Sequence, residues 1–178
     1  AQDLVQTAFG GRFTSMLNTE LRIKSGLTYG ASSQVQRPRE PGMVAITSFT
    51  KTETTKQAMD LAIATLDRLH RDGLDAATLQ SARHYIAGQF APDLETAPQL
   101  AAQLVDLALY GEGRETVDGY LGKVAAATPA EVAAATAVFP RSGDLAIVAI
   151  GDASKIREAL RGYGPLTEMK LTDPRFSP

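Results

Sequence analysis

The residues in this sequence best suited to chemistry are Arg22 and Tyr29, which lie seven positions apart in the stretch 10–31. Arginine offers a planar fork of N–H donors, and tyrosine offers one O–H donor. Both side chains could therefore donate hydrogen bonds to the carbonyl oxygens of an extended peptide. A structural interpretation is also open, in which Arg22 caps helix carbonyls or pairs with a surface carboxylate and Tyr29 is a half-buried strand residue. Spacing alone favours the structural interpretation, because structural ion pairs are common.

Short-range signals around this pair predict a helix that is followed by a strand. Gly26 stands where the helix should end, because glycine adopts the left-handed conformation of a helix C-terminus without a Cβ penalty. Residues 27–33 favour an extended chain. A single tight turn would therefore bring a cation at a helix end close to a phenol at a strand start. The helix itself is predicted from apolar residues at helical spacing, which are Phe13, Met16, Leu17 and Leu21.

The segment Gly10–Ala31 resembles the C-terminal homologous domain of the pitrilysin/insulinase-type zinc metallopeptidases, the inverted zincins, in their bacterial or processing-peptidase-like forms. The shared features are a glycine-rich turn, a helix with Ser and Leu, a Leu-Arg pair and Gly-Leu-x-Tyr at the family's spacing. In that family the arginine and the tyrosine bind substrate backbone carbonyls beside the scissile bond. The resemblance therefore implies that Arg22 and Tyr29 bind substrate. Arg12 and Ile23 depart from the family pattern, which leaves the subfamily open.

We expect neither a catalytic residue nor a metal ligand in this chain. An inverted zincin needs His-x-x-Glu-His on a helix and a distant Glu. The sequence contains only His70 and His84, and neither is followed by a second histidine four positions later. Catalytic zinc is held by three protein ligands. The resemblance implies that zinc is bound by an N-terminal homologous domain, on the same polypeptide or on a partner subunit, so that this chain alone should be inactive.

The composition is that of an ordinary globular protein. The chain has 178 residues, a net charge of −2 and a hydrophobic fraction of 44%, which together favour one domain with a substantial core. Nucleic acid is not an expected partner, since the sequence has no basic tail and no basic-aromatic pattern. No apolar run approaches the length that spans a bilayer, so a membrane partner is not expected either. Cysteine is absent, and the compartment stays open between periplasm and cytoplasm.

Two strands are predicted close to the pair, at residues 27–36 and 43–50. A turn at Pro38 and Pro41-Gly42 separates them, and such a short loop predicts an antiparallel hairpin. The hairpin would place Tyr29 at the beginning of its first strand.

Consecutive helices follow the hairpin, and one of them should bury Leu100, Leu104 and Leu107. The unbroken apolar run 144–152 predicts a strand in the middle of the sheet, and 166–172 predicts an edge strand. This order does not alternate strand with helix. It favours an α+β fold, a two-layer sandwich with helices packed on one face of a mostly antiparallel sheet. The resemblance implies the same layout.

The beginning of the chain leads to an expectation about the domain. Residues 1–9 are predicted to form a helix with Leu4, Val5 and Ala8 on its apolar face, and no strand precedes it. The family's domain opens with a strand and a loop ahead of this helix. We therefore expect residues 1–178 to form a single domain that lacks its first strand.

Three functional hypotheses follow. The first is the substrate-binding half of a zinc-dependent endopeptidase, which binds an extended peptide and closes with its zinc-binding partner around a chamber. The second is a non-catalytic structural or processing-partner subunit of the same family, and a dimer is a further option for its assembly. The third is an unrelated small α+β binding module. The presence of both Arg22 and Tyr29 favours the first, and a His-x-x-Glu-His motif in the partner domain would separate it from the second.

Overall fold

Helix α1 (Gln2–Phe9) is the most buried element of the computed structural model, which describes residues 1–36 and 42–172. Leu4, Val5 and Phe9 are fully buried, and Ala8 is 1% exposed. The expected apolar face of this helix is therefore confirmed. Because its buried residues occupy most of two turns, α1 can be contacted by other elements on several sides.

A β-hairpin packs against α1 and the short helix that follows it. Strands β1 (Ala31–Val35) and β2 (Val44–Ser48) pair antiparallel, in a register that runs from Ala31 opposite Ser48 to Val35 opposite Val44. The antiparallel hairpin is confirmed, and both strands are shorter than the segments predicted for them. Of the predicted turn, Pro38 and Pro41 lie outside the described residues.

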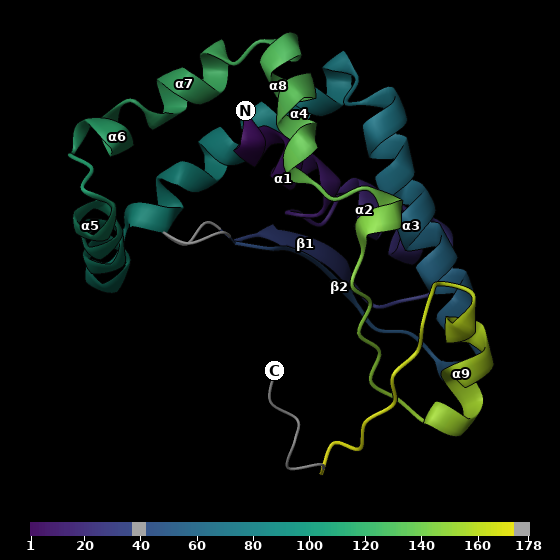
Figure 1. Cartoon of the computed structure of the whole chain (residues 1–178). Helices are drawn as coiled ribbons and strands as arrows, with labels where there is room; N and C mark the ends of the chain where they lie inside the picture. Colours follow the sequence, from purple (N-terminus) through teal and green to yellow (C-terminus); the bar gives the residue numbers. More distant parts are fainter. Residues whose placement is uncertain (37–41, 173–178) are drawn as a thin grey trace.

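The other elements are helical. Between α1 and β1 lie α2 (Met16–Asn18) and the π-helical segment η1 (Thr19–Lys24). Figure 1 shows the helices as an arc that runs from α9 past α3, α4 and α8 to α7, α6 and α5, with the hairpin inside it. The elements after the hairpin are η2 (Thr52–Thr54), α3 (Thr55–Asp72), α4 (Ala76–Phe90), η3 (Pro92–Leu94), α5 (Ala97–Tyr110), α6 (Glu115–Asp118), α7 (Tyr120–Ala126), α8 (Pro129–Ala135), η4 (Thr136–Val138), η5 (Ser142–Asp144) and α9 (Ala153–Arg161).

Side-chain caps fix where several of these helices begin. The carboxylate of Asp75 accepts a hydrogen bond from the backbone N–H of Thr78 at 2.6 Å, which starts α4. A capping box of Thr128 and Glu131 starts α8. Such caps satisfy backbone N–H groups that have no partner within the helix.

The core lies where α1 meets α4, α8 and β1. The rings of Phe9 and Phe139 meet edge to face, with centroids 5.1 Å apart, and α3 contributes Leu66 and Leu69, both fully buried. The α+β class is therefore confirmed, with an antiparallel hairpin and helices packed around one core. Within the described residues, no helix is long and apolar enough to cross a membrane.

Three expectations about later elements were wrong. The run 144–152 does not form a strand, and Val148 within it is 83% exposed. The segment 166–172 forms no strand either. Apolar composition favours extended chain at both places, but a strand exists only when a neighbour pairs with its backbone, and no described segment does so here. Helix α5 buries Leu107 but leaves Leu104 66% exposed.

Candidate functional site

Arg22 lies on a helical segment that is wider than an ordinary α-helix. The hydroxyl of Ser15 caps α2 by accepting a hydrogen bond from the backbone N–H of Asn18. The chain then continues as η1, where the N–H of Ser25 donates to the carbonyl of Glu20, five residues earlier, at 3.2 Å. Such π-helical turns are rare and occur frequently at functional sites.

The predicted helix was therefore wrong in one respect. Leu17 and Leu21 are buried as expected, but Phe13 lies before the helix and is 57% exposed. Residues 10–15 are not helical, so helical spacing does not apply to Phe13.

The turn after η1 holds Tyr29 in place. Gly26 has a φ of 64°, as the sequence predicted, and the N–H groups of Leu27 and Thr28 both donate to the carbonyl of Leu21. Thr28 is buried, its hydroxyl donates to the carbonyl of Gly30 at 2.8 Å, and it accepts from the Gly30 N–H. These hydrogen bonds fix the backbone on both sides of Tyr29.

The structure brings Arg22 and Tyr29 together. The Arg22 guanidinium carbon lies 4.4 Å from the centre of the Tyr29 ring and 4.7 Å from the centre of the Phe13 ring. Tyr29 is 75% exposed and stands two residues ahead of β1, so it is not the half-buried strand residue of the structural interpretation. Within the described residues, neither the guanidinium N–H groups nor the Tyr29 hydroxyl has a hydrogen-bond or ion-pair partner, and both can donate to a ligand.

The acidic residue next to this site is already paired. Glu20 forms ion pairs with Lys24 and Arg68, each at 2.9 Å, and the second of these joins η1 to α3. Partial burial acts to raise the pKa of Glu20, but the hydrogen bonds and charges of Lys24 and Arg68 outweigh it and hold the pKa below its usual value. Glu20 therefore stays ionised at neutral pH and stabilises the segment that carries Arg22.

Asn18 is a supporting residue that the sequence analysis missed. Its side chain is 4% exposed, its amide nitrogen donates to the carbonyl of Phe13 at 2.6 Å, and its amide oxygen accepts from the N–H of Ala31 at 3.2 Å. One buried amide thus connects the turn before α2 to the first residue of β1. Its place between the predicted apolar positions Leu17 and Leu21 could have signalled this role, since buried polar groups need partners.

Gly10 allows β1 to approach this part of the chain. The N–H of Ser33 donates to the carbonyl of Gly10 at 3.1 Å, and a Cβ on Gly10 would lie 2.3 Å from the Ser33 nitrogen. The neighbouring Arg12 does not point to solvent. Its guanidinium donates to the carbonyl and hydroxyl of Ser81 at 2.9 Å each, so Arg12 is used to join the turn to α4.

The two histidines make structural contacts. A ring nitrogen of His70 donates to the carbonyl of Pro140 at 2.9 Å, and His84 contacts the side chain of Gln80 at 2.9 Å. In the described part of the chain, no three residues of the types that ligate metals come together. The residues that the structure describes therefore do not provide a zinc site.

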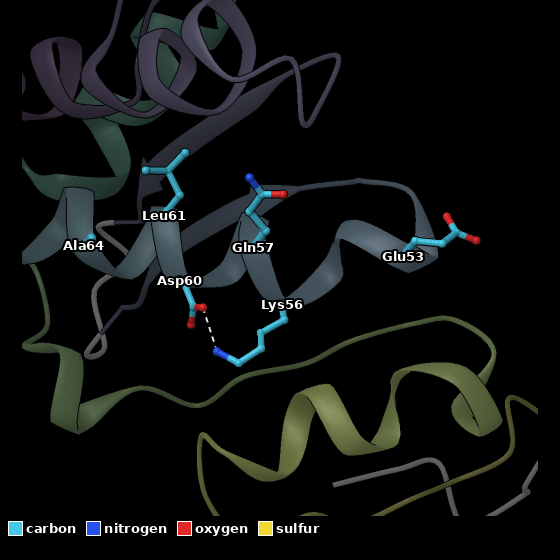
Figure 2. A pocket seen from close by; sticks show the side chains of 6 residues that line it. All are labelled: Glu53, Lys56, Gln57, Asp60, Leu61 and Ala64. Carbon is cyan, nitrogen blue, oxygen red and sulfur yellow. Dashed lines mark hydrogen bonds and ion pairs between the residues drawn. The ribbon is translucent and has the colours of Figure 1, made fainter.

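A hollow along α3 is lined by none of the residues that surround Arg22 and Tyr29. Figure 2 shows that Lys56 and Asp60 point toward each other there, in an ion pair of 2.7 Å. Both side chains are more than half exposed, and such exposed pairs contribute little free energy. Asp60 also accepts a hydrogen bond from Tyr163, at 2.6 Å, which gives it a structural role. The lining residues are Glu53, Lys56, Gln57, Asp60, Leu61 and Ala64.

A known protein family matches the first part of this chain in sequence. Residues 1–86 match the family model of the peptidase M16 inactive domain. This matched part contains α1, α2, η1, the hairpin, α3 and most of α4, and therefore every residue of the site described above. No match was found among curated proteins.

Solved structures share the fold. A peptidase M16 inactive domain from Pseudomonas fluorescens is 23% identical, with a TM-score of 0.68 over 75% of this chain and 32% of that one. A protease from Helicobacter pylori is 17% identical, with a TM-score of 0.65 over 76% of this chain and 33% of that one. A candidate zinc protease from Bordetella pertussis Tohama I is 17% identical, with a TM-score of 0.61 over 76% and 77% of the two chains.

The chain spans about a third of the length of the first two of these proteins. At such low identities the structural likeness establishes the fold, and the sequence match to the family model covers the first 86 residues. Together, the sequence match and the shared fold confirm the resemblance to the C-terminal, inactive domain of the peptidase M16 family.

Proposed function

We propose that this chain is the substrate-binding half of a zinc-dependent endopeptidase. In this proposal Arg22 and Tyr29 donate hydrogen bonds to the backbone carbonyls of an extended peptide. Zinc is held by an N-terminal homologous domain or a partner subunit, where it would polarise the scissile carbonyl and activate a water molecule. In this proposal the residues that the structure describes supply no metal site, and the chain needs that partner for activity.

The observation that carries the proposal is the pair of unoccupied donors on one exposed surface. Arg22 and Tyr29 are held 4.4 Å apart, from guanidinium carbon to ring centre, although Arg22 lies on η1 and Tyr29 in the turn after it. Their donors have no partner among the described residues, whereas the other cations of the stretch, Arg12 and Lys24, are bonded to side chains or backbone of this chain. Preorganised donors of this kind stabilise a negatively charged oxygen as it develops in a transition state.

The geometry also explains why backbone recognition suits this site. An arginine fork and a phenol can each donate to a carbonyl oxygen, a group that every peptide residue presents. Such contacts bind the main chain of an extended substrate and leave sequence preference to other surfaces. The proposal therefore predicts cleavage of unfolded peptides of varied sequence.

The test is peptide hydrolysis by the protein reconstituted with its zinc-binding partner. Variants Arg22→Ala and Tyr29→Phe are compared with the unaltered protein, and circular dichroism checks that each variant is folded. Loss of one transition-state donor should lower kcat by about 10²–10³. A matched control is Lys24→Ala, which removes a cation of the same segment whose charge is already paired with Glu20, and it should leave kcat within about twofold.

Other results would select a different function. Zinc-dependent cleavage that is indifferent to both substitutions would show that Arg22 and Tyr29 do not contact the substrate. The absence of cleavage under every partner condition would favour a non-catalytic subunit, in agreement with the name of the family domain as inactive.

A further inference from the structure

Phe13 contacts Arg22. Its ring could not do so if it were buried on the apolar face of a helix, as its spacing predicted. The ring is 57% exposed, yet its centre lies 4.7 Å from the Arg22 guanidinium carbon. The Tyr29 ring lies 4.4 Å from the same carbon, so two aromatic rings share one cation. An exposed phenylalanine is costly to hydrate, and here part of its ring is covered by the guanidinium.

The backbone of Phe13 is held by the same side chain that holds the strand after Tyr29. The buried amide of Asn18 donates to the Phe13 carbonyl and accepts from the Ala31 N–H. The two rings are therefore anchored to one point of the fold, although they lie sixteen positions apart. This arrangement fixes the space into which the Arg22 side chain extends.

We propose that Phe13 is a positioning residue, which holds the Arg22 guanidinium ready to donate to the substrate. The proposal rests on the function proposed above for Arg22. A ring in contact with the plane of a guanidinium leaves the N–H groups at its edge free to donate. A long side chain loses rotamer entropy when it binds a ligand, and a side chain that is already stacked has lost part of it beforehand.

A second cation–π contact of the chain supplies the control. Arg12 lies 5.9 Å from the centre of the Tyr85 ring on α4, and its guanidinium is bonded to Ser81. Tyr85→Leu removes an aromatic ring from beside an arginine, as Phe13→Leu does, but at an arginine whose Nη1 already donates to Ser81. It should leave turnover unchanged.

The experiment is a double-mutant cycle on the reconstituted protein, with peptide hydrolysis as the readout. Phe13→Leu should lower kcat/KM by about two- to five-fold, mostly through kcat, as the loss of one exposed cation–π contact predicts. Phe13→Tyr keeps the ring and should restore the activity of the unaltered protein. In an Arg22→Ala background, Phe13→Leu should cause no further loss, because Phe13 acts through Arg22.

Each alternative outcome has a distinct meaning. If Arg22→Ala slows hydrolysis but Phe13→Leu does not, or if Phe13→Leu costs the same with and without Arg22, the positioning role is overturned and the proposed function stands. If Arg22→Ala has no effect, the proposed function fails and the role of Phe13 fails with it. Thermal unfolding confirms that the variants fold, and Phe13→Met, which keeps most of the volume without a ring, replaces Phe13→Leu if that variant does not fold.

Discussion

At the scale of single residues, the charges that the structure describes around the site leave the donors of Arg22 free. Glu20 is the nearest carboxylate in the sequence, and it is occupied by Lys24 and by Arg68 of α3. Arg22 is therefore not neutralised by its neighbour, and its position is set by aromatic contacts that leave its N–H edge open.

The ion pairs of Glu20 predict a pH-dependent contribution to stability. The pKa of Glu20 is lowered in the folded protein, so its contribution is fully present above its unfolded value of 4.5 and is lost as the pH falls through the folded value. Glu20→Gln should lower the free energy of unfolding by about 1 kcal/mol at pH 7, since both partners are partly exposed. The difference from the unaltered protein, measured by urea denaturation, should shrink as the pH is lowered below 4.5.

An exposed acid-to-amide change serves as the control for this prediction. Asp72→Asn alters the ion pair with Arg71, whose two side chains are 67% and 53% exposed, and it should change stability little at pH 7 or pH 3. If Glu20→Gln lowered the free energy of unfolding equally at pH 7 and pH 3, burial of the Glu20 side chain, and not its charge, would be the source of its contribution to stability.

At the scale of elements, the site depends on how closely the turn before α2 approaches β1. The Gly10 carbonyl is bonded to the Ser33 N–H, and Gln6 of α1 contacts both the hydroxyl and the carbonyl of Ser33. β1 begins at Ala31, directly after the turn that carries Tyr29. Any change that moves β1 away from α1 would therefore also move Tyr29 relative to Arg22.

Gly10→Ala tests this dependence. The new Cβ would lie 2.3 Å from the Ser33 nitrogen, and because that atom belongs to the backbone of a paired strand, the strand has to shift. Such overpacking typically costs about 1–3 kcal/mol of the free energy of unfolding, measured by chemical denaturation. The matched control is Gly88→Ala on α4, where the new Cβ would meet no atom beyond its own helix turn within 4 Å, and it should raise stability by about 0.5–1 kcal/mol. An unchanged free energy of unfolding in Gly10→Ala would contradict the close approach of Gly10 to β1.

At the scale of the whole molecule, α9 is attached to the rest of the fold through α3 and η2, at one end of the arc of helices (Figure 1). Tyr163, just after α9, donates its hydroxyl to Asp60 of α3, more than a hundred positions earlier. Burial, followed by this hydrogen bond and the negative charge of Asp60, raises the pKa of Tyr163 to about 12.

The raised pKa of Tyr163 predicts a loss of stability at alkaline pH. The contribution of a group with a raised pKa is fully present below its unfolded value of 10 and is lost as the pH rises toward 12. Tyr163→Phe should therefore be less stable than the unaltered protein at pH 8. This difference should shrink as the pH rises from 10 to about 12. Absorbance titration of the phenolates gives an independent check, since the component that ionises near pH 12 should be absent from Tyr163→Phe.

The second half of the chain shows what sequence patterns could not establish at this scale. The run 144–152 has the composition of a central strand, but within the described residues it pairs with no other segment. The same holds for α5, whose apolar spacing predicted burial but whose Leu104 and Val105 are largely exposed. Periodicity specifies which face a segment would bury, whereas burial itself requires a second element to cover that face.

The amino-acid sequence alone was enough to predict several local features of this protein. It was sufficient to predict the apolar face of α1, the glycine that ends η1, the antiparallel hairpin and the candidate pair Arg22 and Tyr29, because each depends on residues close together in the chain. Three contacts became known only from the tertiary structure. The exposed Phe13 ring contacts Arg22, Asn18 links the turn before α2 to β1, and Glu20 is bound by Arg68 of α3. These contacts join atoms of separate elements, and the wider turns of η1 alter the direction of the side chains, so neither spacing nor composition could predict them.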